Sequence, residues 1–166
     1  MNRRMVLYTL GHITLANAAL LLLPAITAAI YGEFSTLWAF LIAVGVSLLL
    51  GFVLRTFSKP GTKVIYGKEG FAIVTYAWLI MAAVGAIPFV ITGAIPSYID
   101  AFFEIVSGFT TTGATILSAE ALHSMSHGLL FWRSFSHWVG GMGVLVFLLA
   151  IVPGDGKGQG FTMHLL

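Results

Sequence analysis

Long uncharged stretches, each dominated by apolar residues, separate the few charged positions along the chain. Four such stretches contain no Asp, Glu, Lys or Arg: residues 5–32, 34–54, 70–99 and 134–154. A helix of about 20 apolar residues, rising about 1.5 Å per residue, crosses the roughly 30 Å hydrocarbon core of a bilayer. The pattern therefore predicts an all-α membrane protein with four spanning helices, over 10–31, 36–54, 71–90 and 128–152.

The composition agrees with a chain that lies in lipid. Hydrophobic residues make up 58% of the 166 positions and charged residues only 8%, and the mean hydropathy is +0.98. Soluble domains carry roughly 25% charged residues, so this chain has too little charge to cover a water-exposed surface. It also contains no cysteine, which excludes disulfides and thiolate metal sites.

The basic residues predict the orientation of the spans. Seven of them fall on one side of the membrane if the spans alternate: Arg3, Arg4, Arg55, Lys59, Lys63, Lys68 and Lys157. By the positive-inside rule that side is the cytoplasm. We therefore expect a cytoplasmic N-terminus, an N-terminal transmembrane hairpin over 1–56, a cytoplasmic basic loop over 57–70 and a cytoplasmic tail over 154–166. Asn17 and Pro24 in the first span favour packing of that helix against protein, where neighbours satisfy its backbone.

A short helix is predicted between the third and fourth spans. Ser97 is a typical N-cap, Asp100 follows three residues later in the manner of a capping box, and Gly108 is a stop signal. A helix over 97–108 is about 18 Å long, little more than half of the hydrocarbon core. We expect it to enter from the outside and to end within the membrane.

The sequence TTTGAT at 110–115 is not typical of a lipid-facing helix. Non-helical backbone at membrane depth occurs only where it is enclosed by protein or lines a water-filled cavity. The segment therefore predicts a re-entrant loop, after which residues 116–127 form a loop on the outer side.

A short helix followed by an extended strand is how cation channels present backbone carbonyls to a dehydrated ion. Such a strand needs a residue with a φ value that is costly for anything but glycine, which points to Gly113. The negative end of the short helix would face the same cation. The alternative is that the small Thr, Gly and Ala residues only allow helices to pack closely.

Two ionisable residues flank the predicted filter. Glu104 lies on the short helix, where we expect its carboxylate to hydrogen-bond the filter backbone from behind or to contact the ion. Arg133, early in the fourth span, is expected to pair with Glu104, Asp100 or Glu120, or to extend toward the interface. His137 lies one turn further along and is interpreted as a packed neutral histidine, with a proton relay as the alternative.

The remaining polar positions predict no catalytic chemistry. His123 and His127 have the i, i+4 spacing of metal ligands, but no third ligand is evident and they fall in the predicted outer loop. No nucleophile elbow, HExxH motif or phosphate-binding glycine pattern is present, so we expect no enzyme. The glycines of the fourth span are interpreted as contacts for tight packing: Gly140, Gly141 and Gly143.

The segments DAFFEIVSGFTTTGAT and FWRSFSHWVGGMGVLVFLLAIVP resemble the first pore repeat of the Trk/Ktr/HKT potassium transporters, with TrkH-type subunits the most similar. The resemblance covers nearly the whole chain, since that type also has a helical hairpin before the first repeat. It implies a pore repeat over 71–153 and a filter at the position of the TVGYG filter of potassium channels. The implied K⁺-binding residues are Thr111, Thr112, Gly113 and Ala114, with backbone carbonyls of Thr111, Thr112 and Gly113 as ligands and with Thr110, Thr115, Glu104 and Arg133 as support.

The resemblance also implies partners and a location. The implied location is the bilayer of a bacterial inner membrane. The implied partners are the remaining pore repeats, a second copy of the full subunit and a cytosolic nucleotide-binding regulator. K⁺ is the implied transported ion, and no bound cofactor and no nucleic acid are expected. One strand cannot form a ring of four, so the other strands come from a longer polypeptide or from identical chains. The apolar ending FTMHLL favours a chain that continues. Channel flow, ion-coupled symport and a non-conducting scaffold remain open as alternatives.

Overall fold

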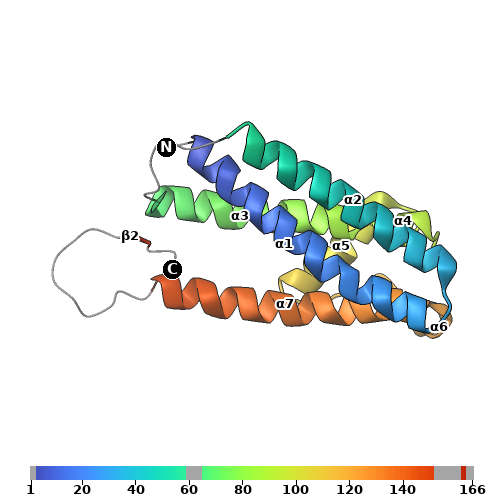
Figure 1. Cartoon of the computed structure of the whole chain (residues 1–166). Helices are drawn as coiled ribbons and strands as arrows, with labels where there is room; N and C mark the ends of the chain where they lie inside the picture. Colours follow the sequence, from blue (N-terminus) through green and yellow to red (C-terminus); the bar gives the residue numbers. More distant parts are fainter. Residues whose placement is uncertain (1–2, 59–64, 152–161, 164–166) are drawn as a thin grey trace.

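The computed structural model describes residues 3–58, 65–151 and 162–163, and backbone only over 65–66, 144–151 and 162–163. Its long helices lie side by side in one elongated bundle (Figure 1). A short antiparallel strand pair, β1 (Ile65–Tyr66) with β2 (Thr162–Met163), lies beyond the end of the bundle where the chain begins.

The first two helices form the predicted hairpin. Helix α1 spans Arg3–Ile30 and α2 spans Phe34–Thr56. A Cβ added to Gly11 would lie 3.0 Å from the Gly51 carbonyl oxygen, so the two backbones approach closely where both residues are small. Asn17 and Pro24 are fully buried, which confirms that α1 packs against protein.

The third span differs from the sequence prediction. Helix α3 covers Gly67–Gly85, and a separate short helix, α4, covers Ile87–Ile91. Pro88 lies in the first turn of α4, and because proline lacks the N–H that a continuous helix would need, the helix is interrupted before it. The predicted loop over 57–70 was also too long, since α3 begins at Gly67, where the acidic residue Glu69 suits the first turn of a helix.

The predicted short helix is present as α5, Tyr98–Phe109. Ser97 caps it, as expected: its Oγ accepts a hydrogen bond from the Asp100 N–H at 3.4 Å. The segment expected to be a loop contains helix α6, Ala119–Ser124, which Ser118 caps by accepting from the Ala121 N–H at 3.2 Å. Helix α7, His127–Ile151, then returns along the bundle.

The centre of the bundle is an aromatic cluster around Trp132 of α7. Trp132 is completely buried, and its ring contacts Phe40 of α2 and Phe109 of α5 edge to face, with ring centroids 6.4 and 5.9 Å away. Its indole Nε1–H donates to the Gly85 carbonyl at 3.0 Å, at the end of α3. The last carbonyl of α3, just before the break between α3 and α4, thus accepts a hydrogen bond from a core side chain. Trp132 of α7 thereby contacts α2, α3 and α5.

Three helical stretches of the described residues are long and apolar enough to cross a membrane: Arg3–Ile30, Phe34–Thr56 and Gly67–Ile91. Helix α7 has 25 residues and matches the expected fourth span over 128–152 in position. The role of α7 as a membrane span stays a prediction. The expected tail over 154–166 lies outside the described residues apart from Thr162–Met163.

Candidate functional site

The segment that follows α5 turns back against that helix, and its N–H groups donate to it. The N–H of Thr112 donates to the Ser107 carbonyl at 3.0 Å, and the N–H of Gly113 approaches the same oxygen at 3.4 Å. The N–H of Thr111 donates to the Gly108 carbonyl at 2.9 Å. These bonds satisfy carbonyls at the C-terminal end of α5, which have no partner within the helix itself.

The direction of the N–H groups fixes the direction of the carbonyls. A trans peptide unit is planar and places its C=O opposite its N–H. Because the N–H groups of Thr111, Thr112 and Gly113 point toward α5, the carbonyls of the preceding residues, Thr110 to Thr112, point away from it. The carbonyls of Thr111, Thr112 and Gly113 accept no hydrogen bond from any described residue, and residues 110–116 are exposed. Consecutive carbonyls are therefore available to an external ligand.

Two residues of this segment have left-handed backbone conformations. Gly113 has φ of +75°, which confirms the expectation that it takes a value costly for other residues. Thr111 has φ of +56°, a conformation that is uncommon for a β-branched residue. The sequence prediction missed Thr111, since threonine gives no signal for positive φ.

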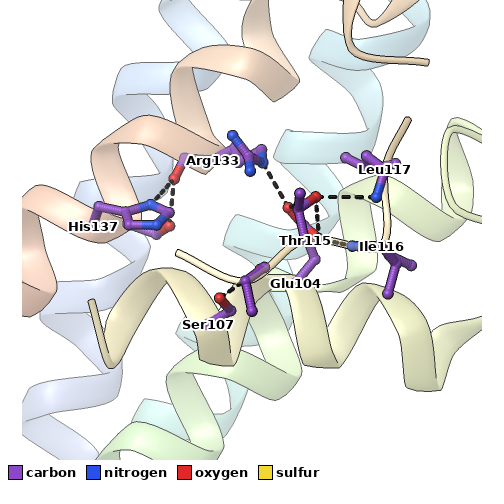
Figure 2. Close-up of polar contacts among 9 residues, drawn as sticks. Glu104, Ser107, Thr115, Ile116, Leu117, Arg133 and His137 are labelled. Carbon is purple, nitrogen blue, oxygen red and sulfur yellow. Dashed lines mark hydrogen bonds and ion pairs between the residues drawn. The ribbon is translucent and has the colours of Figure 1, made fainter. Parts of the chain in front are cut away.

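Glu104 of α5 lies behind this segment and is 2% exposed. Its carboxylate accepts hydrogen bonds from the Thr115 hydroxyl, at 2.9 and 3.0 Å, and from the Ile116 N–H at 3.3 Å. Nε of Arg133 on α7 donates to Oε1 of Glu104 at 2.6 Å (Figure 2). Of the partners expected for Arg133, the structure shows Glu104, so Arg133 of α7 and residues 115–116 share one buried carboxylate.

The side chains of the other predicted site residues are also placed. The Thr110 hydroxyl donates to the Val106 carbonyl at 2.8 Å and lies 2.8 Å from the Thr112 hydroxyl. The carbonyl of Ala114 accepts a hydrogen bond of 2.6 Å from Oγ of Ser107. Ala114 therefore differs from Thr111, whose carbonyl has no partner among the described residues.

Glycines of α7 allow close contact with the site. A Cβ on Gly140 would lie 2.2 Å from the Phe109 carbonyl oxygen, and a Cβ on Gly143 would lie 3.0 Å from the Trp78 ring. The interpretation of these two as packing contacts is confirmed, whereas a Cβ on Gly141 would meet nothing within 4 Å. His137 packs here too, with Nδ1 2.9 Å from the Arg133 carbonyl (Figure 2).

At the other end of α7, Glu33 caps the helix from the hairpin turn. Its carboxylate accepts from the His127 N–H at 2.7 Å, the Gly128 N–H at 3.0 Å and the His127 ring Nδ1 at 2.9 Å. Tyr31 stacks on the same ring, with centroids 4.0 Å apart. Burial alone would raise the pKa of Glu33, but the hydrogen bonds from Gly128 and His127 outweigh it, and the pKa lies below its ordinary value.

This contact was not predicted, and it changes the interpretation of the histidines. His123 lies in α6 and His127 begins α7, so the loop expected there was wrong. Within the described ranges, no group of three or more His, Cys, Asp or Glu residues could hold a metal ion. His127 is instead a partner of a carboxylate 94 positions earlier in the chain.

Comparison with known proteins identifies the family. The TrkH family, described as a cation transport protein, matches residues 34–164. The chain belongs to this family. The Trk system potassium uptake protein TrkH of Salmonella typhimurium is 36% identical to it over 159 residues, which are 95% of this chain and 32% of that protein. The Trk system potassium uptake protein TrkG of Escherichia coli K12 is 31% identical over 151 residues, 90% of this chain and 30% of that protein.

The fold is that of a TrkH protein. The crystal structure of the potassium transporter TrkH from Vibrio parahaemolyticus matches with a TM-score of 0.84 and 31% identity, over 95% of this chain and 33% of that one. The expected fold class, an all-helical membrane protein with a hairpin before a helix, short helix and helix repeat, is therefore confirmed. The chain spans about a third of the length of the relatives that it matches.

Proposed function

We propose that this chain supplies one strand of a potassium-selective filter in a membrane transport protein. The observation that carries the proposal is the backbone of Thr111 to Gly113, whose carbonyls have no hydrogen-bond donor among the described residues. Desolvated K⁺ is held by backbone carbonyls that replace its hydration shell. Potassium is the proposed ion because TrkH and TrkG relatives are named potassium uptake proteins.

Support for the strand comes from behind it. Glu104 holds Thr115 and Ile116 by hydrogen bonds, and Arg133 compensates the charge of the buried carboxylate. This arrangement holds the side of the strand that faces Glu104 and leaves the carbonyls of Thr111 to Gly113 free to bind an ion. The alternative of a non-conducting scaffold, in which these small residues only allow close helix packing, gains no support from this segment, since residues 110–116 are exposed.

The proposed pore requires further strands and a defined orientation. A ring of carbonyls needs four strands, which other repeats of the same polypeptide or other copies would supply. The exposed cations Arg3, Arg4, Arg55 and Lys68 lie at the start of α1, the end of α2 and the start of α3, and these helix ends are together at one end of the bundle (Figure 1). This one-sided distribution supports a cytoplasmic N-terminus, and the proposed membrane is a bacterial inner membrane. We also propose that full subunits form a dimer and bind a cytosolic nucleotide-binding regulator. The proposed role is transport, without enzymatic activity.

The test is K⁺ uptake by potassium-depleted cells that express the protein from its complete gene. Gly113→Asp or Gly113→Arg places a charged side chain at a position with φ of +75° in the filter. Gly93→Asp is a matched control, since Gly93 has φ of +74°, has open space around it and lies in the turn between α4 and α5.

We expect the Gly113 variants to lose uptake at normal protein levels and the Gly93 variant to retain it. Unchanged uptake in both Gly113 variants would refute the filter and favour the scaffold. Equal loss in the Gly93 control would show that charge in a strained turn, and not the filter position, causes the defect.

A further inference from the structure

Ser107 of α5 bonds to the segment 110–116 through both its backbone and its side chain. We call this segment the strand. Its carbonyl receives the N–H of Thr112, and its Oγ donates to the Ala114 carbonyl at 2.6 Å. Ser107 is 5% exposed, so water has little access to this hydroxyl. The bond is short for an O–H···O pair, which indicates a well-formed contact.

This contact gives the Ala114 carbonyl a direction opposite to that of the Thr111, Thr112 and Thr115 carbonyls. The carbonyls of Thr111 and Thr112 point away from α5, whereas that of Ala114 points toward it. The Ile116 N–H donates to Glu104, so the Thr115 carbonyl again points away from that carboxylate. One carbonyl in the strand is therefore reversed, and the residue just before it is Gly113, with φ of +75°.

We propose that Ser107 is a positioning residue that withholds the Ala114 carbonyl from the ion and so sets the number of carbonyls that this strand offers. The proposal rests on the proposed filter function. Selectivity between K⁺ and Na⁺ depends on the number and the geometry of the coordinating carbonyls. When the Ser107 hydroxyl is absent, the Ala114 carbonyl is free to turn toward the pore, and the strand loses a tether that keeps the ring from contracting around the smaller Na⁺.

The experiment compares ion selectivity, because a purely structural role for Ser107 would change protein yield and not the ratio between ions. Ser107→Ala removes the donor. Ser124→Ala is the matched control, since the Ser124 hydroxyl also donates to a carbonyl, that of Ala121 at 3.1 Å, but in exposed helix α6. The protein is expressed from its complete gene, and K⁺ and Na⁺ fluxes are measured in the same proteoliposomes.

We expect the K⁺ to Na⁺ flux ratio of Ser107→Ala to fall about two- to tenfold, the factor that corresponds to one ordinary hydrogen bond. The ratio of Ser124→Ala stays at the wild-type value. If Ser107→Ala does not accumulate in the membrane, Ser107→Cys decides, because its thiol is a weaker donor of similar size and should give an intermediate ratio.

A wild-type ratio in Ser107→Ala, or in Ser107→Cys where alanine fails to fold, would overturn the role of Ser107. The Gly113→Asp variant in the same assay distinguishes a failure of the role of Ser107 from a failure of the proposed filter. Loss of flux in Gly113→Asp with an unchanged ratio in Ser107→Ala would leave the filter standing and remove only Ser107. Normal flux in Gly113→Asp would remove the filter itself.

Discussion

Nε of Arg133 on α7 lies 2.6 Å from Oε1 of Glu104 on α5, and this ion pair connects α7 to the carboxylate that holds the segment after α5. The side chain of Glu104 is 1% exposed and that of Arg133 is 20% exposed. A carboxylate buried this deeply needs both a charge partner and hydrogen-bond donors, and Thr115 and Ile116 supply the donors. The pair therefore couples the position of α7 to the geometry of the strand.

Breaking this pair should destabilise the protein and impair uptake. Glu104→Gln leaves the Arg133 guanidinium without its carboxylate, and removing one member of a buried pair costs about 3 kcal/mol. We expect a clear fall in the melting temperature in detergent and reduced K⁺ uptake. Glu120→Gln on α6, where the carboxylate is exposed, should change neither. Equal melting temperatures for the wild type and Glu104→Gln would contradict the role of the pair.

The double variant tests whether the two residues act together. Arg133→Gln alone leaves the buried Glu104 carboxylate uncompensated and should be at least as harmful as Glu104→Gln. In the Glu104→Gln background the same change should lower the free energy of unfolding much less, because the carboxylate that it would leave unpaired is already absent. Additive losses in a double-mutant cycle of melting measurements would show that Arg133 and Glu104 contribute independently.

Adjacent glycines of α7 should respond oppositely to alanine. At Gly140 a Cβ would lie 2.2 Å from the Phe109 carbonyl oxygen, a backbone atom that cannot rotate away, so Gly140→Ala forces α7 from α5 at a cost of about 1–3 kcal/mol. At Gly141 nothing lies within 4 Å, and alanine should be neutral or stabilising by up to about 1 kcal/mol. Melting measurements that ranked the two variants in the reverse order would refute this packing.

The Glu33 cap predicts a pH dependence of stability. The pKa of Glu33 in the folded protein lies below its ordinary value of 4.5, so the ionised carboxylate stabilises the fold. That contribution is complete above the unfolded pKa and is lost as the pH falls through the folded pKa. Glu33→Gln should therefore melt lower than the wild type at neutral pH, and the difference should shrink in acid below the unfolded value. A difference that stays constant from neutral to acid pH would exclude the carboxylate as its source.

Features that depend on local sequence could be predicted. The Ser97 cap followed from the order of Ser97 and Asp100, and the positive φ of Gly113 followed from the demand for an extended strand. Burial of Asn17 followed from the cost of a polar side chain in lipid. Helix α6 was missed although Ser118 is a typical cap, because its six residues are too few to show an apolar period.

Features that depend on the spatial arrangement could not be predicted. Glu33 and His127 are 94 positions apart, and nothing near either residue in the sequence indicates the other. The Ser107 hydroxyl reaches Ala114 only because the chain reverses between them, with Thr111 at φ of +56°. The choice of Glu104 among three possible partners for Arg133 likewise required the packing of α7 on α5.

The binding position of a potassium-like ion tests the proposed filter most directly. Crystals of the transport-competent protein soaked in thallium(I) would show the ion by anomalous diffraction. We expect a peak coordinated by the carbonyls of Thr111, Thr112 and Gly113, with the Ala114 carbonyl still bound to Ser107. A thallium peak elsewhere in the pore, with none against these three carbonyls, would contradict it.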